Sequence, residues 1–260
     1  MGASRPPCTS SSRSAYAESM IHDPRSFNAP LTLATARRLV ELTNPEPEST
    51  ALDVGCGRGE LLALWLEAGG GSVHGVDPLA SETDLARQRL TPFRGRAHVH
   101  SSNYDVAVLP ANFDVAFCIG ATHAFGGAGV AFRAALEGLR ERVRPGGRVL
   151  VGEGYWKQSP DPAYLAATGM SASDLVSHAE NHAVGEALGL RTLYVTAATQ
   201  SEWDDFEAGS GLAAERKLDA DPDDPELQRS IEQRRAWRRS YLTWGRDTFG
   251  FGYYLFEVPA

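Results

Sequence analysis

The sequence predicts an α/β protein, with a doubly wound, mostly parallel sheet of seven strands and a helical cap. Short apolar runs alternate with segments of helical periodicity through the first two thirds of the chain, which is typical of βαβ units. A glycine-rich turn, Gly55-Cys56-Gly57-Arg58-Gly59, follows the first apolar run and opens an amphipathic segment. At 260 residues, with 42% hydrophobic residues, the chain fits one globular domain with a sizeable core.

The seven expected strands are bounded by turn residues. Asp77-Pro78 ends the second strand, and Pro145-Gly146-Gly147 turns the chain into the fifth. In chain order, the strands are expected at residues 51–54, 72–76, 96–100, 113–119, 148–152, 190–199 and 251–258.

The helices between the strands carry apolar residues at helical spacing. Phe132, Leu136 and Leu139 give one helix its core face, Ser81 is placed to cap another, and Gly189 stops a third. Helices are expected at about residues 31–42, 59–68, 81–90, 130–143, 175–188 and 225–244. We expect one domain over residues 15–260 after a disordered tail at 1–14, with cap segments at about 15–42, 159–183 and 201–244.

The charge of the chain argues against several classes of partner. A net charge of -8 leaves no basic excess to neutralise phosphates, so we expect no nucleic-acid partner and no binding to anionic membranes. The basic run at residues 234–239 includes Trp237, but its helix also carries acidic residues. We therefore interpret the run as a solvated helix face.

The cysteines and the apolar runs indicate the cellular compartment. Cys8, Cys56 and Cys118 show no disulfide or metal-ligand spacing, so we expect no metal. No apolar run approaches the roughly 20 residues that cross a bilayer. The N-terminus lacks the apolar core of a signal peptide, and we expect a cytoplasmic protein.

The glycine loop indicates a ligand site at the start of a helix, because its glycines remove the Cβ atoms that would keep a ligand from the backbone. Asp77 follows at about the distance at which a carboxylate meets a ribose in nucleotide sites. The structural alternative is a turn or helix-capping aspartate before Pro78. Dinucleotide sites usually show Gly-x-Gly-x-x-Gly, whereas this loop is Gly-x-Gly-x-Gly, and Asp53 suits a ligand with a cationic amino group. Adenosine joined to an amino acid fits both halves.

At these residues the chain resembles the class I S-adenosylmethionine (SAM) methyltransferases. Leu52–Gly59 is similar to their first motif, Val73–Asp77 to their ribose strand, and Val143–Arg148 to their turn into the fifth strand. The resemblance implies a Rossmann-like fold and SAM as cofactor. Through Glu202–Asp204 and Trp244–Asp247 it extends to a bacterial subgroup of small-molecule methyltransferases.

The resemblance also implies which residues contact each part of SAM. The glycines and Asp53 would surround the methionine part, and Asp77 would hold the ribose. Asn103 stands where the family commonly has an aspartate that binds the adenine amino group, and its amide oxygen can accept the same bond. The expected cofactor residues are Asp53, Gly55, Cys56, Gly57, Gly59, Asp77, Pro78, Asn103, Tyr104, Ile119 and Gly120.

Candidate catalytic residues follow the fourth and fifth strands, at the edge where open α/β sheets bind ligands. His123 is the candidate base, because a histidine side chain is largely neutral at cytoplasmic pH and can accept a proton. Its alternative role is a hydrogen bond within the loop or a contact to the cofactor. Glu153 could hold a cationic amine or steer a proton, and Tyr155 with Trp156 could form an aromatic wall. For Trp156, packing in the core is an equal alternative.

The acceptor pocket is expected to draw on the cap. Residues 15–30 would fold over the cofactor as a lid, as in similar enzymes, and the alternative is an ordinary N-terminal helix that packs on the sheet. We assign to this pocket Tyr16, His22, Phe27, Trp156 and Trp244.

Together these features predict transfer of a methyl group from SAM to a small-molecule acceptor, at oxygen or nitrogen rather than carbon. With Lys157 and Lys217 as the only lysines among 25 basic residues, the composition indicates a GC-rich bacterial genome, and we expect a role in secondary metabolism. The oligomeric state is left open between monomer and homodimer. The alternatives are a non-catalytic SAM-binding sensor or partner protein, and an NAD-dependent dehydrogenase, which would need the wider glycine spacing.

Overall fold

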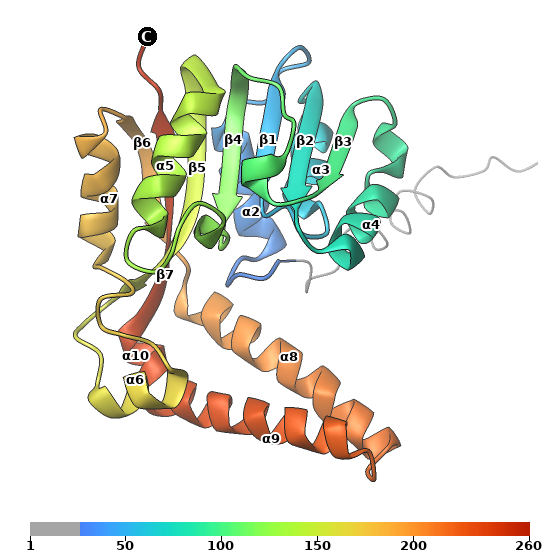
Figure 1. The fold of residues 1–260 in the computed structure, drawn as a ribbon, viewed down its shortest axis with the longest axis vertical. Helices are drawn as coiled ribbons and strands as arrows, with labels where there is room; N and C mark the ends of the chain where they lie inside the picture. The colour runs from blue at the N-terminus through green and yellow to red at the C-terminus, as the bar shows by residue number, and fades with distance from the viewer. Residues whose placement is uncertain (1–26) are drawn as a thin grey trace, which may run out of the picture.

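The computed structural model describes residues 27–260. Figure 1 shows a sheet with helices on both faces and a long helical pair beneath it. The seven strands run in the order β3-β2-β1-β4-β5-β7-β6, and β7 alone is antiparallel to its neighbours. They are β1 (Thr50–Val54), β2 (Ser72–Asp77), β3 (Ala97–Ser101), β4 (Phe113–Ile119), β5 (Val143–Trp156), β6 (Arg191–Ala197) and β7 (Phe249–Glu257). The predicted doubly wound, seven-stranded, mostly parallel sheet is confirmed.

The helices fall into those that cover the sheet and those that lie beyond it. The covering helices are α2 (Leu33–Leu42), α3 (Glu60–Glu67), α4 (Ala80–Arg89), α5 (Ala131–Arg142) and α7 (His178–Ala187). Beyond the sheet lie α6 (Pro162–Thr168), α8 (Gln200–Ala220), α9 (Pro225–Ser240), the π-helical η4 (Tyr241–Gly245) and α10 (Arg246–Thr248). Short 3-10 turns are η1 (Thr91–Phe93), η2 (Tyr104–Val106) and η3 (Thr122–Ala124).

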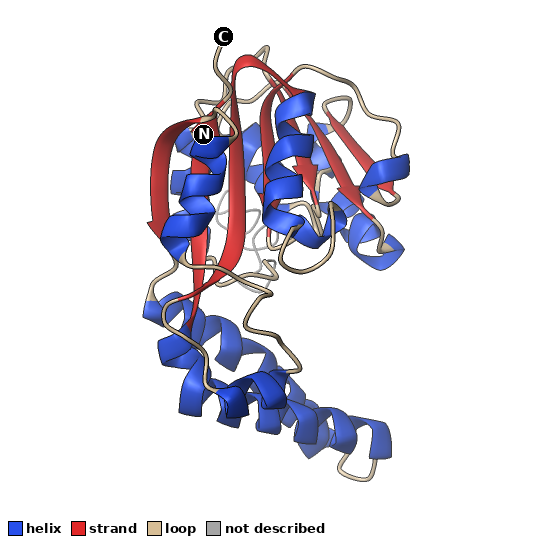
Figure 2. Cartoon of the chain, turned by 60° about the vertical axis from the view of Figure 1, so that its left-hand side comes forward, coloured by secondary structure: helices blue, strands red, loops and turns tan. Residues whose placement is uncertain are grey.

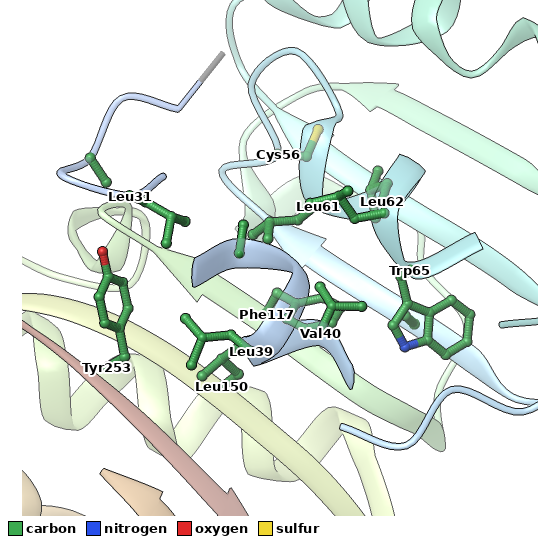
Figure 3. Packing of buried hydrophobic residues seen from close by; sticks show 14 of the residues in the cluster. Leu31, Leu39, Val40, Cys56, Leu61, Leu62, Trp65, Phe117, Leu150 and Tyr253 are labelled. Atoms are coloured by element: carbon green, nitrogen blue, oxygen red, sulfur yellow. The ribbon is translucent and has the colours of Figure 1, made fainter. Parts of the chain in front are cut away.

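The central strands β1, β4 and β5 carry buried apolar residues on both faces, so each face of the sheet builds its own hydrophobic cluster. On β5, Leu150 joins one cluster, while Val149 and Val151 join the other, as the period of two in a strand requires. Figure 3 shows the first cluster, where Leu39 of α2 and Trp65 of α3 pack over the strands. Because both faces are covered, the ends of the strands are left as the place for a ligand.

The cap differs from the sequence-based expectation at both of its borders. Residues 33–42 form α2, which packs against α3 on the sheet and is not part of the cap; of the segment expected as a lid or an N-terminal helix, residues 15–26 lie outside the described residues. Residues 178–183 belong to α7, which packs on β6 with a capping box formed by Ser177 and Glu180. The cap within residues 27–260 is therefore built by α6 and by α8 to α10.

The helical hairpin of α8 and α9 projects away from the sheet below the carboxyl ends of the parallel strands (Figures 1 and 2). Arg235 of α9 donates to both carboxylate oxygens of Glu215 on α8, at 2.9 and 2.5 Å. Thr32 and Thr35, at the start of α2, donate to Glu202 of α8 at 2.9 and 2.5 Å. The base of the hairpin is thus fastened to the segment that leads into α2.

Several boundaries follow from contacts that are distant in sequence. β5 continues past the expected 148–152 to Trp156, because β7 pairs with it from Arg148 onward. The expected helix at 225–244 leaves α-helical geometry after Ser240, where Gly245 lies close to Tyr164. A Cβ on that glycine would be 2.8 Å from the tyrosine hydroxyl oxygen. No helix within residues 27–260 has the length and apolar character to cross a bilayer.

Candidate functional site

The glycine loop joins β1 to α3 at the carboxyl edge of the sheet. The backbone N–H of Gly55 donates to the carbonyl oxygen of Val76 at 2.8 Å, which fastens the loop to β2. Gly55 and Gly57 have φ values of +76° and +47°, in the left-handed region that favours glycine. A Cβ on Gly55 would lie 2.1 Å from the Cβ of a neighbouring alanine, whereas one on Gly57 would meet nothing within 4 Å. Gly57 therefore leaves open space beside the loop backbone.

Asp77 ties this loop to the next turn. Its Oδ2 accepts from the N–H of Gly57 at 3.0 Å, and its Oδ1 accepts from the N–H of Leu79 at 2.9 Å. The second bond is the turn contact that the structural alternative predicted. A carboxylate has about four lone-pair sites, and Asp77, 9% exposed, also lines the cavity described below. Asp77 can thus hold the turn and still accept from a ligand's hydroxyl groups.

Asp53 is a deeply buried acid beside the loop, with 2% of its surface exposed. Burial raises the pKa of Asp53 to about 8, and the charge of Asp77 adds to the rise. A cation placed next to Asp53 would favour its ionised form. Burial, together with both aspartates, also raises the pKa of the Cys56 thiol, so Cys56 is not an activated nucleophile.

The far side of the site follows β3. Asn103 immediately precedes η2, and the ring of Tyr104 lies 4.4 Å from the ring of Phe125, centre to centre. The Tyr104 hydroxyl donates to the carbonyl of Gly138 on α5 at 3.4 Å. Asp105, which the sequence did not single out, lines the same cavity. It is a second candidate, beside Asn103, for binding an adenine amino group.

These elements enclose a cavity of about 910 Å³, here called the glycine-loop cavity. Most of the predicted cofactor residues line it, namely Asp53, Gly55, Cys56, Gly57, Asp77, Pro78, Asn103, Tyr104, Ile119 and Gly120. Gly59 does not line it; this residue precedes α3 and packs on Ala86. The structure thus brings one end of β1, β2, β3 and β4 together around one cavity.

His123 and Glu153 meet at one corner of this edge. His123, on η3, is exposed and lines the glycine-loop cavity. Glu153 is not among the lining residues; it accepts a short hydrogen bond from the hydroxyl of Thr122 and one from the N–H of Gly154 at 2.7 Å. Burial raises the pKa of Glu153, while these hydrogen bonds and the neighbouring His123 lower it in part.

The predicted aromatic wall is not at the cavity, and we correct these assignments. Tyr155 packs against His178 of α7, with tilted rings whose centres are 4.8 Å apart. The Trp156 ring packs 5.6 Å from that of Phe249, centre to centre, and its Nε1 donates to the carbonyl of Ala172. Trp244 lies in η4, on the cap. Residues 154–156 continue β5 away from the glycine loop, because β7 pairs with that strand as far as Trp156. The Tyr155 ring therefore packs on α7, and the Trp156 ring packs against β7 and against Tyr164 of the cap helix α6.

Only one of the N-terminal residues assigned to the acceptor pocket lies in the described part of the chain. Tyr16 and His22 lie outside residues 27–260, whereas Phe27 lines the glycine-loop cavity, together with Asn28 and Ala29. Sequence reasoning missed Leu79, which also lines the cavity and is 60% exposed. Its position, two residues after the aspartate expected to bind the ribose, was a usable signal. Within residues 27–260, no group of three or more His, Cys, Asp or Glu side chains is arranged to hold a metal ion.

Comparisons with known proteins match the motifs to one family. A family model described as a methyltransferase domain matches residues 52–149. The YjhP protein of Escherichia coli (strain K12) is 33% identical over 239 residues, which cover 90% of this chain and 92% of that protein.

Two solved structures extend the likeness to the whole fold. A SAM-dependent methyltransferase from Geobacter sulfurreducens, in complex with S-adenosyl-L-homocysteine (SAH), is 27% identical with a TM-score of 0.81, covering 94% of this chain and 98% of that one. A SAM-dependent methyltransferase from Thiobacillus denitrificans, also in complex with SAH, is 26% identical with a TM-score of 0.78, covering 95% and 98%.

The whole-length relative and the motifs around the glycine loop point the same way. The family model and both solved structures are described as methyltransferases, which favours this activity over the dehydrogenase and the non-catalytic sensor that the sequence left open. The chain belongs to the YjhP-like bacterial family of class I SAM methyltransferases, and it is a SAM-dependent methyltransferase.

Proposed function

We propose that this methyltransferase acts on a small-molecule acceptor in bacterial secondary metabolism, at an oxygen or nitrogen atom, with His123 as the base. The observation that carries the proposal is the corner at the ends of β4 and β5. His123 lines the glycine-loop cavity there, and Glu153 binds the residue directly before it, Thr122. A proton acceptor and a half-buried carboxylate thus stand at the edge where the acceptor must approach.

The residues present fit SAM on the methyl-donor side. The space at Gly57 lets a ligand reach the loop, and Asp53 offers a buried carboxyl group to an ammonium. Asp77 keeps free acceptor capacity for ribose hydroxyls. Asn103 and Asp105 both offer oxygen acceptors at the side of the cavity assigned to adenine.

When bound, SAM supplies a methyl group on a sulfonium, which is open to in-line displacement. The acceptor's oxygen or nitrogen forms a bond to the methyl carbon as the carbon–sulfur bond breaks, and the electron pair of that bond goes to sulfur. His123 takes the proton that the acceptor loses. The cavity walls around His123 align the acceptor and exclude water.

Glu153 acts as a positioning residue in this proposal, because it does not line the cavity. Its hydrogen bond with Thr122 fixes the start of η3, and its charge acts on His123. The imidazolium that forms when His123 accepts a proton is stabilised by a carboxylate nearby. Loss of this carboxylate should therefore lower kcat more than it changes the affinity for SAM.

The test is a search for the product. The purified protein is incubated with methyl-labelled SAM and metabolite extracts of its own organism, and labelled compounds are identified by mass spectrometry. We expect a labelled ether, ester or amine, with kcat about 100-fold or more lower in His123→Asn and SAH affinity unchanged.

A matched control separates the base from its loop. His182→Asn changes a histidine on α7, outside the glycine-loop cavity, and should leave kcat unchanged. Glu153→Gln should lower kcat and change the acid limb of the pH profile. A label found on carbon, or full activity of His123→Asn at every pH, would contradict the proposal.

A further inference from the structure

A second cavity, of about 470 Å³, lies between the two arms of the helical hairpin. We call it the hairpin cavity. Its floor is apolar and is built by Phe206 and Ala214 of α8 and by the buried Ile231 of α9. Nothing in the proposed transfer of a methyl group from SAM uses this cavity.

One wall of the hairpin cavity carries three arginines, Arg234, Arg235 and Arg238 of α9. Two acids face them from α8. Glu215 is committed to Arg235 through the two hydrogen bonds described above, and it lies 3.9 Å from Arg238. No ion pair joins Arg234 to another residue in the described part of the chain.

The second acid adds little negative charge. Glu207 accepts a hydrogen bond from Nε1 of Trp237 at 2.8 Å, and burial raises the pKa of its carboxyl group. Three permanent positive charges, those of the arginines, thus face two acids. The carboxylate of Glu215 is fully paired, and burial favours the neutral form of Glu207. The cavity combines an apolar floor with a surplus of positive charge.

The hairpin cavity adjoins the glycine-loop cavity, because Asn28 lines both. The carbonyl oxygen of Asn28 lies 3.4 Å from the position of a Cβ on Gly120, the residue that follows β4. Figure 1 shows this segment between the carboxyl edge of the sheet and α8. Thr32 and Thr35 fasten it to Glu202. A molecule seated in the hairpin cavity can therefore contact, at Asn28, a residue that also lines the glycine-loop cavity.

We propose that the hairpin cavity binds the anionic end of the methyl acceptor. The acceptor class is then an amphiphilic small molecule with an apolar body and a carboxylate, phosphate or sulfate group. This inference rests on the proposed function, since it assigns a class to the acceptor of that same site.

Binding of simple probes tests the proposal without catalysis. Octanoate and octyl phosphate share an apolar chain with octylammonium and differ from it in the sign of the head group. Binding of each is measured by titration calorimetry with SAH present. We expect both anions to bind and octylammonium to bind at least about tenfold more weakly. The ratio of the two anion affinities shows whether the cavity prefers a carboxylate or a phosphate head group.

Variants test whether the probe binds in the hairpin cavity. Arg234→Gln combined with Arg238→Gln should weaken anion binding by about fivefold or more, as expected for two partly exposed charges. Arg239→Gln, on the same helix but outside the cavity, should leave binding unchanged. Circular dichroism and a thermal melt check that each variant is folded.

The outcomes separate this inference from the proposed function. Equal binding of octylammonium, equal losses in the double variant and in Arg239→Gln, or no anion binding by protein that binds SAH would each overturn the anionic class. Loss of SAH binding in the double variant would assign the arginines to the methyl donor and also overturn it. Failure of the wild-type protein to methylate any metabolite, with anion binding intact, would count against the proposed function alone.

Discussion

Replacement of Asp77 by asparagine tests the donor side of the site at its most connected residue. The wild-type carboxylate accepts from the N–H of Gly57 at 3.0 Å and from that of Leu79 at 2.9 Å. An asparagine has a single oxygen acceptor, so its amide nitrogen would face one of the two N–H groups. At least one bond to a charged acceptor is lost, and such bonds contribute about 1.5–3 kcal/mol each.

The same change also leaves one oxygen fewer for the ribose hydroxyls of a bound ligand. Loss of one such bond to a charged acceptor, again about 1.5–3 kcal/mol, should weaken SAH binding by about 10- to 100-fold, since about 1.4 kcal/mol corresponds to a factor of ten. Titration calorimetry with SAH measures it. Asp84→Asn on α4 is the matched control, because the Asp84 side chain is 75% exposed and only pairs with Arg87 on the same helix. Its affinity for SAH should stay within about twofold of wild type.

A double-mutant cycle separates a ribose contact from damage to the loop. SAH analogues that lack the 2′- or the 3′-hydroxyl should bind the wild-type protein about tenfold more weakly, as expected for a lost charge-assisted hydrogen bond. In Asp77→Asn, the affinity of the same analogues relative to SAH should fall much less. Unchanged SAH affinity in the variant, or equal losses in both proteins, would refute the ribose assignment.

Three further predictions concern the frame of the site. Gly57→Ala should keep its fold but weaken SAH binding in calorimetry. Gly55→Ala, whose Cβ would lie 2.1 Å from another Cβ, should instead lower the free energy of unfolding in urea by about 3 kcal/mol or more. Equal losses of stability in the two variants would contradict the geometry. Because the pKa of Asp53 is raised from 3.8 to about 8, the native state binds the extra proton, and the stability of the ligand-free protein should fall as pH rises across that range. SAM binding near neutral pH should release a proton, measured by calorimetry in buffers of different ionisation enthalpy, and Asp53→Asn should abolish both effects. Arg89→Met should lower the free energy of unfolding in urea by about 3–5 kcal/mol, because it removes the arginine 3.0 Å from the buried Glu60. The double variant Arg89→Met with Glu60→Leu should recover most of the lost stability. No recovery would mean that the broken ion pair is not the cause of the loss.

The gathering of the glycine-loop residues and Asp77 around one cavity was predictable because its geometry is local. Gly55, Gly57 and Asp77 follow directly on the strands that position them, so spacing along the chain fixes spacing in the fold. Asn103 was harder, since η2 places Asp105 in the same cavity, and sequence alone does not choose between the two.

The acceptor half was less predictable because long-range contacts build it. Tyr155 and Trp156 follow a strand end in sequence, yet pairing with β7, almost a hundred residues later, carries them away from the cavity. The helix α8 has few apolar residues and two glycines, and only its capping box, Thr199 with Glu202, marks its start. The basic run of α9 is a solvated face on one side, as expected, but it also closes a cavity that no spacing along the chain indicates.

This division has a consequence for how the acceptor can vary in such a protein. The residues of the glycine loop are held by hydrogen bonds from their backbone N–H groups, from Gly55 to the carbonyl oxygen of Val76 and from Gly57 to the carboxylate of Asp77, which do not involve the hairpin. The hairpin is attached through the ends of β6 and β7 and through Glu202, and its cavity meets the donor cavity at Asn28. Changes on α9 can therefore alter the head group that is recognised while the methyl-donor site keeps its geometry. That independence is the reason why the arginine variants are expected to lose anion binding and to keep their affinity for SAH.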